Sequence, residues 1–182
     1  MLHGPRKGKG VLRIDLAHAD TEPVEFDERP VVPPAAGGED VVSAAPVEIA
    51  GRVERLGRGY RLDGRVEGGG TLRCVRCLTE FEFTFSERLD LHLVPVAVVP
   101  RDEETRLARG DLEVRFYDEP SVDLTELAAE QFALAVPMKP LCAESCRGIC
   151  PRCGANLNQG ACSCPPVSND RSAPLSDWRP SE

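Results

Sequence analysis

Aromatic residues are scarce in this chain of 182 residues, and so are long apolar runs. Six phenylalanines, two tyrosines and one tryptophan stand beside sixteen glycines and sixteen prolines, which indicates many turns and a modest hydrophobic core. Such a composition favours strands over long helices. Because a transmembrane helix needs about 20 consecutive apolar residues, the sequence also predicts a protein that does not enter a membrane.

Features of a secreted protein are lacking too. The basic, glycine-rich residues 1–10 are not followed by the apolar run that a secretory signal requires. Cysteines of a protein in the reducing cytoplasm are rarely disulfides and are more often metal ligands or redox groups. We therefore expect a cytoplasmic protein with reduced cysteines.

The usual signs of an enzyme are also missing. The three histidines, His3, His18 and His92, are scattered, and no serine or cysteine nucleophile has a histidine neighbour. Residues 68–70 form a glycine run without the lysine and the following helix that a phosphate-binding loop needs. The sequence therefore predicts a protein that acts by binding rather than by catalysis.

Eight cysteines are the most informative residues present, and six of them lie between positions 142 and 164. Cys150 and Cys153 are separated by two residues and precede Gly154, a spacing that places two thiolates on a tight turn. Cys162 and Cys164 return a second pair after a short loop. Four sulfurs can then surround one tetrahedral zinc ion.

The other four cysteines predict a second site. Cys74 and Cys77 repeat the two-residue spacing, and one helical turn across Cys142 and Cys146 would bring their sulfurs to the same face. Together the sites imply two zinc ions, each closed by four sulfurs and therefore structural. Three alternatives stay open: a single local site with Cys142 and Cys146 unused, a binuclear cluster with shared thiolates, or an iron–sulfur cluster.

The cysteine-rich segment, residues 142–164, has too few apolar side chains to build a core. Besides cysteine and alanine, only Leu141, Ile149 and Leu157 contribute. Segments shorter than about 40 residues seldom fold without a disulfide, a metal or a partner. Structural zinc can supply about 10–16 kcal/mol of apparent binding free energy, so we expect this segment to fold only with metal.

The rest of the chain alternates apolar and polar residues as strands do. Residues 47–53 and 60–66 predict a hairpin, residues 68–70 a turn, residues 81–93 further strands, and residues 112–117 a closing strand. The expected division of the chain is into N-terminal strands (1–29), a proline- and glycine-rich linker or loop (30–46), a β-rich core (47–141), the cysteine-rich zinc element (142–164) and a disordered tail (165–182).

One helix is predicted, over residues 124–136. Asp123 and Glu126 fit a capping box at its start, apolar residues recur along one stripe, and Pro137 ends it. We expect this helix to cover the apolar face of the sheet and to lead to Cys142. The predicted fold class is α+β and mainly β: an antiparallel sheet covered by one helix, with a C-terminal zinc-knuckle element.

Charge is unevenly distributed along the chain, whose formal net charge is −8. Residues 15–40 hold eight acids and one arginine, whereas residues 52–76 hold seven arginines and three acids. Four arginines of the basic stretch are candidates for contact with RNA or a protein partner: Arg61, Arg65, Arg73 and Arg76. The alternative is that they balance thiolate charge and solvate one face of the sheet.

Three parts of the sequence resemble those of one known family. Residues 72–78 (LRCVRCL) place a basic residue between two cysteines, and residues 122–127 (VDLTEL) cap a helix that runs on to residues 136–142 (VPMKPLC). Residues 146–158 (CRGICPRCGANLN) are rich in cysteine. Read together, they resemble the YceD family, called large ribosomal RNA subunit accumulation proteins. The insertion at residues 30–46 and the tail after Cys164 depart from the family pattern.

The resemblance implies a bacterial or plastid-type cytosolic protein that is needed for normal accumulation of large-subunit ribosomal RNA and is not an enzyme. The resulting hypothesis is a zinc-binding factor that supports accumulation of 23S rRNA and assembly of the large ribosomal subunit, with that RNA or a ribosomal protein as partner. Two alternatives are an acidic adaptor that captures a basic ribosomal protein and a thiol redox sensor. The oligomeric state stays open, because an exposed edge strand can pair with a second copy.

Overall fold

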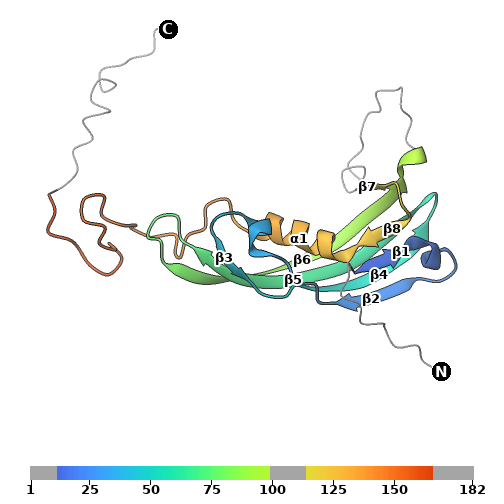
Figure 1. Cartoon of the computed structure of the whole chain (residues 1–182), viewed down its shortest axis with the longest axis horizontal. Helices are drawn as coiled ribbons and strands as arrows, with labels where there is room; N and C mark the ends of the chain where they lie inside the picture. Colours follow the sequence, from blue (N-terminus) through green and yellow to red (C-terminus); the bar gives the residue numbers. More distant parts are fainter. Residues whose placement is uncertain (1–11, 99–113, 166–182) are drawn as a thin grey trace, which may run out of the picture.

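A computed structural model describes residues 12–98 and 114–165. Within these ranges, eight strands form two sheets and one α-helix lies over the larger sheet (Figure 1). The small sheet joins β1 (Arg13–Asp15) to β8 (Ser121–Asp123). The larger sheet contains β2 (Val24–Glu28), β3 (Val41–Ala44), β4 (Glu48–Leu56), β5 (Gly59–Arg73), β6 (Glu80–Pro95) and β7 (Val114–Tyr117). The helix is α1 (Leu124–Ala135), and the 3₁₀ turns are η1 (Leu16–Asp20), η2 (Pro34–Gly37) and η3 (Val96–Val98).

The larger sheet is mixed rather than purely antiparallel. Its order is β2-β4-β5-β6-β7, and β3 and β4 pair with successive parts of β5. All these pairings are antiparallel except that of β6 with β7, which is parallel. The expected mainly β fold with one helix is confirmed, but alternation of apolar and polar residues carries no information on strand direction. The expected tail, apart from Pro165, lies outside the described residues.

The predicted glycine turn at residues 68–70 is wrong, because β5 continues through all three glycines to Arg73. Two of these positions lie opposite aromatic residues of β6, with Gly68 paired to Phe85 and Gly70 paired to Phe83. A Cβ atom on Gly68 would lie 2.8 Å from the Phe85 ring. The glycines therefore make room within a long strand instead of reversing it.

Part of the expected linker or loop, residues 30–46, is built into the fold. Its proline pair begins η2, and β3 pairs with the end of β5 from Val41 opposite Leu72. Val32 and Val41 are buried in the core. Glycine and proline dominate the composition here and predict a loop, yet two buried valines attach the segment to the sheet.

Helix α1 covers the apolar face of the sheet, as the sequence predicts (Figure 1). The Asp123 carboxylate accepts hydrogen bonds from the backbone N–H groups of Thr125 and Glu126, at 2.9 and 3.1 Å. Phe132 is fully buried against Phe83 and Phe85. In the part of the chain that the structure describes, no helix is both long and apolar enough to cross a membrane.

Candidate metal centres

Four cysteines from two distant parts of the chain meet beyond one end of the sheet. Cys74 and Cys77 follow β5 directly, and Cys142 and Cys146 follow the exit of α1. The sulfur atoms of Cys74 and Cys146 lie 3.7 Å apart, those of Cys77 and Cys142 lie 3.6 Å apart, and all four lie within 4.8 Å of one another. We call this group the first centre.

The remaining four cysteines form a second centre within the C-terminal segment. The sulfurs of Cys150, Cys153, Cys162 and Cys164 also lie within 4.8 Å of one another. Figure 1 shows that this segment, drawn in orange and red, extends away from the sheet. The structure therefore brings the eight cysteines together in two groups of four, and each group can hold a metal ion.

The spacing of the sulfurs fits a metal better than a disulfide. Four sulfurs around one ion, each about 2.3 Å from it, are separated by about 3.8 Å, close to the 3.6 and 3.7 Å in the first centre. A disulfide requires sulfurs about 2.05 Å apart, and all eight cysteines are free thiols here. The donor set thus matches tetrahedral thiolate coordination.

The two pairs with two-residue spacing adopt the same backbone turn. The N–H of Leu78 donates to the carbonyl of Cys74, and the N–H of Gly154 donates to the carbonyl of Cys150, both at 2.9 Å. The residue at this position has a positive φ in each turn, +61° at Leu78 and +73° at Gly154. Glycine meets this requirement without strain. Leu78 occupies the same left-handed conformation, which the sequence alone does not reveal.

The predicted helical turn across Cys142 and Cys146 is wrong. These residues form a tight turn instead, in which the N–H of Cys146 donates to the carbonyl of Ala143 at 3.0 Å. The N–H of Val75 donates to the carbonyl of Pro140 at 3.0 Å and so holds the start of this turn against the first cysteine pair. The two sulfurs converge through this turn and its anchor rather than through helical periodicity.

Backbone N–H groups stabilise one thiolate in the first centre. Burial raises the pKa of Cys74, but hydrogen bonds from backbone N–H groups, led by that of Cys142, outweigh this effect and lower the pKa to about 6. The hydrogen bond with Cys77 raises the pKa of Cys142 to about 12. Cys142 thus keeps the proton that it shares with a neighbouring sulfur, and a metal ion would replace such protons.

The second centre repeats this electrostatic arrangement. Hydrogen bonds from the backbone N–H groups of Cys153 and Arg152 lower the pKa of Cys150 to about 6. The hydrogen bond with Cys153 raises the pKa of Cys164 to about 12. Each centre therefore contains at least one thiolate already stabilised by the backbone.

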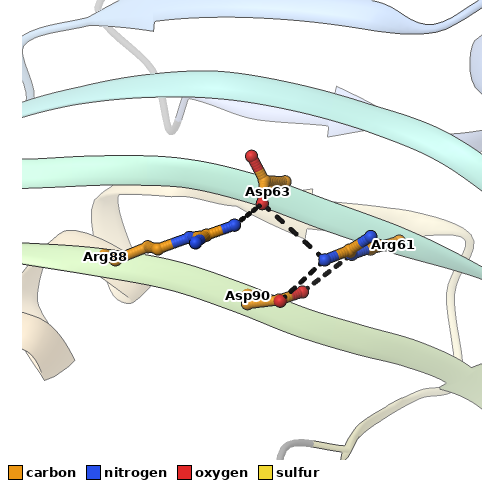
Figure 2. Close-up of polar contacts among 4 residues, drawn as sticks. All are labelled: Arg61, Asp63, Arg88 and Asp90. Carbon is orange, nitrogen blue, oxygen red and sulfur yellow. Dashed lines mark hydrogen bonds and ion pairs between the residues drawn. The ribbon is translucent and has the colours of Figure 1, made fainter.

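The four candidate arginines do not form a bare cationic surface. Arg61 binds both carboxylate oxygens of Asp90, at 2.8 and 2.7 Å, and also lies 3.9 Å from Asp63, which Arg88 binds at 2.8 Å (Figure 2). The hydrogen bond from Arg61 lowers the pKa of Asp90. Figure 2 shows the four side chains alternating in charge across β5 and β6.

The other three arginines also have partners in the described structure. Arg65 pairs with Glu67 at 3.1 Å, and Arg73 pairs with Glu80 at 3.8 Å. Arg76 donates instead to the carbonyl of Cys146 at 2.9 Å. Arg65 and Arg73 are more accessible than Arg61, because their side chains are 69% and 48% exposed and that of Arg61 is 34% exposed.

Comparison with known proteins identifies the family of the chain. Residues 62–177 match the family model described as large ribosomal RNA subunit accumulation protein YceD. The chain belongs to the YceD family. The match includes all eight cysteines and the whole of α1, and the resemblance predicted from the sequence is confirmed.

Relatives occur in bacteria and in a plant. An uncharacterized protein of Mycobacterium tuberculosis is 26% identical over 163 residues, which cover 85% of this chain and 76% of the relative. The chloroplastic YCED homolog 1 of Arabidopsis thaliana, named as a large ribosomal RNA subunit accumulation protein, is 26% identical, with 78% of this chain and 51% of the relative covered. No solved structure matches the chain.

Proposed function

We propose that the chain is a zinc-stabilised, non-enzymatic factor that acts in the cytoplasm and supports the accumulation of 23S rRNA and the assembly of the large ribosomal subunit. The observation that carries this proposal is the pair of four-cysteine centres in a chain of the YceD family. Four thiolates suit zinc and leave no open position for a substrate. The family description supports the link to ribosomal RNA.

Zinc would act by fastening separate parts of the molecule together. Cys77 and Cys142 are 65 positions apart in the sequence, yet their sulfurs lie 3.6 Å apart. An ion in the first centre would therefore join the end of β5 to the exit of α1. An ion in the second would close a segment that has little apolar core of its own.

The proposal is tested by complementation in cells whose own copy is deleted. Loss of the protein should lower the level of 23S rRNA, and a variant with both Cys77→Ser and Cys153→Ser should fail to restore it. Ser145→Ala is the matched control, since Ser145 is an exposed neighbour of the first centre and not a ligand. Full restoration by the double cysteine variant would contradict a metal-dependent role.

Contact with RNA is proposed for the accessible arginines. Arg65→Gln combined with Arg73→Gln should weaken binding to a large-subunit rRNA fragment in a filter-binding assay, because phosphate contacts depend on cationic side chains. Arg13→Gln is a suitable control, since Arg13 is 55% exposed but lies in the small sheet. Equal RNA binding by the wild-type protein, the double variant and the Arg13→Gln control would show that Arg65 and Arg73 do not contact the RNA.

A basic ribosomal protein is a second candidate partner, and the charge of the sheet supports it. The face turned away from α1 carries nine carboxylates, Glu25, Asp27, Glu48, Glu54, Asp63, Glu67, Glu80, Glu82 and Asp90, and five arginines, Arg52, Arg61, Arg65, Arg73 and Arg88. A hollow of about 560 Å³ on this face is lined by Glu48, Glu67 and Glu82. Glu48→Gln with Glu82→Gln should then weaken capture of a basic ribosomal protein while RNA binding persists, and Glu22→Gln is the control. A thiol redox sensor would instead release metal on reversible oxidation.

A further inference from the structure

Residues 155–158 lie between two ligands of the second centre in the sequence, but they contact the first centre in the structure. This segment lies between Cys153 and Cys162, inside the loop that the second centre closes. The side-chain amide nitrogen of Asn158, however, lies 3.3 Å from the sulfur of Cys146, a member of the first centre. A residue placed by the second centre therefore touches the first.

The orientation of the Asn158 amide is fixed from both ends. Its oxygen accepts a hydrogen bond from the backbone N–H of Arg147 at 2.7 Å. Because only the oxygen can accept this bond, the NH₂ group must face the Cys146 sulfur. The backbone N–H of Asn158 also donates to the side-chain oxygen of Asn156 at 2.9 Å, which limits movement of the segment.

Two further hydrogen bonds hold the segment near the first centre, and a third holds the neighbouring residue Ile149 against the first cysteine turn. Asn156 donates to the hydroxyl of Thr79 at 3.3 Å, beside the first cysteine pair. The N–H of Leu157 donates to the carbonyl of Gly148 at 2.9 Å, and the N–H of Ile149 donates to the carbonyl of Arg76 at 3.1 Å. A Cβ atom on Gly148, where φ is +77°, would lie 3.1 Å from that same Arg76 oxygen. Residues 146–149 thus lie between Arg76 of the first cysteine turn and Leu157 of the segment 155–158, and they are hydrogen-bonded to both.

We infer that the two centres are energetically coupled, and that Asn158 is the positioning residue that couples them. This inference rests on the proposed occupancy of both centres by metal. An ion in the second centre holds residues 155–158 in place, so that the Asn158 N–H group stabilises the Cys146 thiolate as a metal ligand. Hydrogen bonds to ligating groups commonly change metal affinity by about 10- to 100-fold. Coupling between two binding equilibria is reciprocal, so each ion strengthens binding of the other by the same factor.

The test uses the full chain loaded with cadmium, a thiophilic ion that gives a separate NMR signal for each centre. Chelator titration measures the affinity of each centre while the other is filled or is disabled by Cys77→Ser or Cys164→Ser. Disabling either centre should lower the affinity of the other by the same factor, about 10-fold or more. In the Asn158→Ala background, both factors should fall to one.

Two further variants separate the sulfur contact from general folding. Asn158→Asp keeps an oxygen for the Arg147 N–H but places a negative charge against the sulfur, so it should also abolish the coupling. Gln159→Ala should retain it, because the Gln159 side chain makes no hydrogen bond in the described structure. Independent centres in the wild-type background, or unchanged coupling in either Asn158 variant, would overturn the inference. Absence of zinc from the purified protein would instead contradict the proposed function.

Discussion

Replacement of Phe132 by alanine should separate the stability of the sheet from the occupancy of the metal centres. Phe132 is fully buried, and its ring centroid lies 5.9 Å from that of Phe83 and 6.2 Å from that of Phe85. Truncation of a buried phenylalanine removes apolar contacts and leaves a cavity, which costs about 3–5 kcal/mol of unfolding free energy. The loss of both aromatic pairs is included in that range, because the same truncation breaks them.

Urea-induced unfolding followed by circular dichroism measures this loss. The control is Leu134→Ala in the same helix, where the side chain is 78% exposed and the change should stay below about 0.5 kcal/mol. Metal content should be unchanged in both variants, because the apolar neighbours of the first centre are Phe81 and Leu141. A cost below about 1 kcal/mol for Phe132→Ala, or loss of metal together with stability, would refute the separation of core and centres.

Three other changes test separate parts of the structure. Cys153→Ser should release one metal ion and unfold the C-terminal segment while the sheet retains its amide NMR signals; loss of the sheet signals would contradict this. Gly70→Val should cost about 1–3 kcal/mol in urea unfolding, since a Cβ atom there would collide with the carbonyl of Ser43; a neutral effect would argue against the continuous strand. Because Arg61 lowers the pKa of Asp90 below its ordinary 3.8, this pair stabilises the fold above that pH and ceases to do so as pH falls through the lowered value. Asp90→Asn should therefore reduce the acid sensitivity of the unfolding free energy, and an unchanged pH profile would show that the pair does not contribute.

Local patterns in the sequence predict several elements well. The capping residue Asp123 and the apolar stripe that includes Phe132 predict α1, whose observed end at Ala135 precedes the expected end by one residue. Each of these signals depends on residues within a few positions of one another. The cysteine spacings likewise predict the thiol pairs, and the structure then groups those pairs into two centres.

Features that depend on distant residues could not be predicted in this way. The glycines at 68–70 are typical of a turn, but the bulky partners that require them, such as Phe85, lie on another strand. Likewise, the sequence does not show that Arg61 pairs with Asp90, because only the strand register places these two side chains together. Asn158 carries no spacing signal at all, and only the folded C-terminal segment places it against Cys146.

The metal content of the purified protein tests the central claim most directly. Elemental mass spectrometry, with free thiols counted in parallel, should find two zinc ions per chain and eight thiols that react only after chelation. One zinc ion per chain would show that only one of the two centres binds zinc, which contradicts the assignment of the other. No metal, with the cysteines present as disulfides, would contradict the assignment of both centres and the reducing compartment on which it depends.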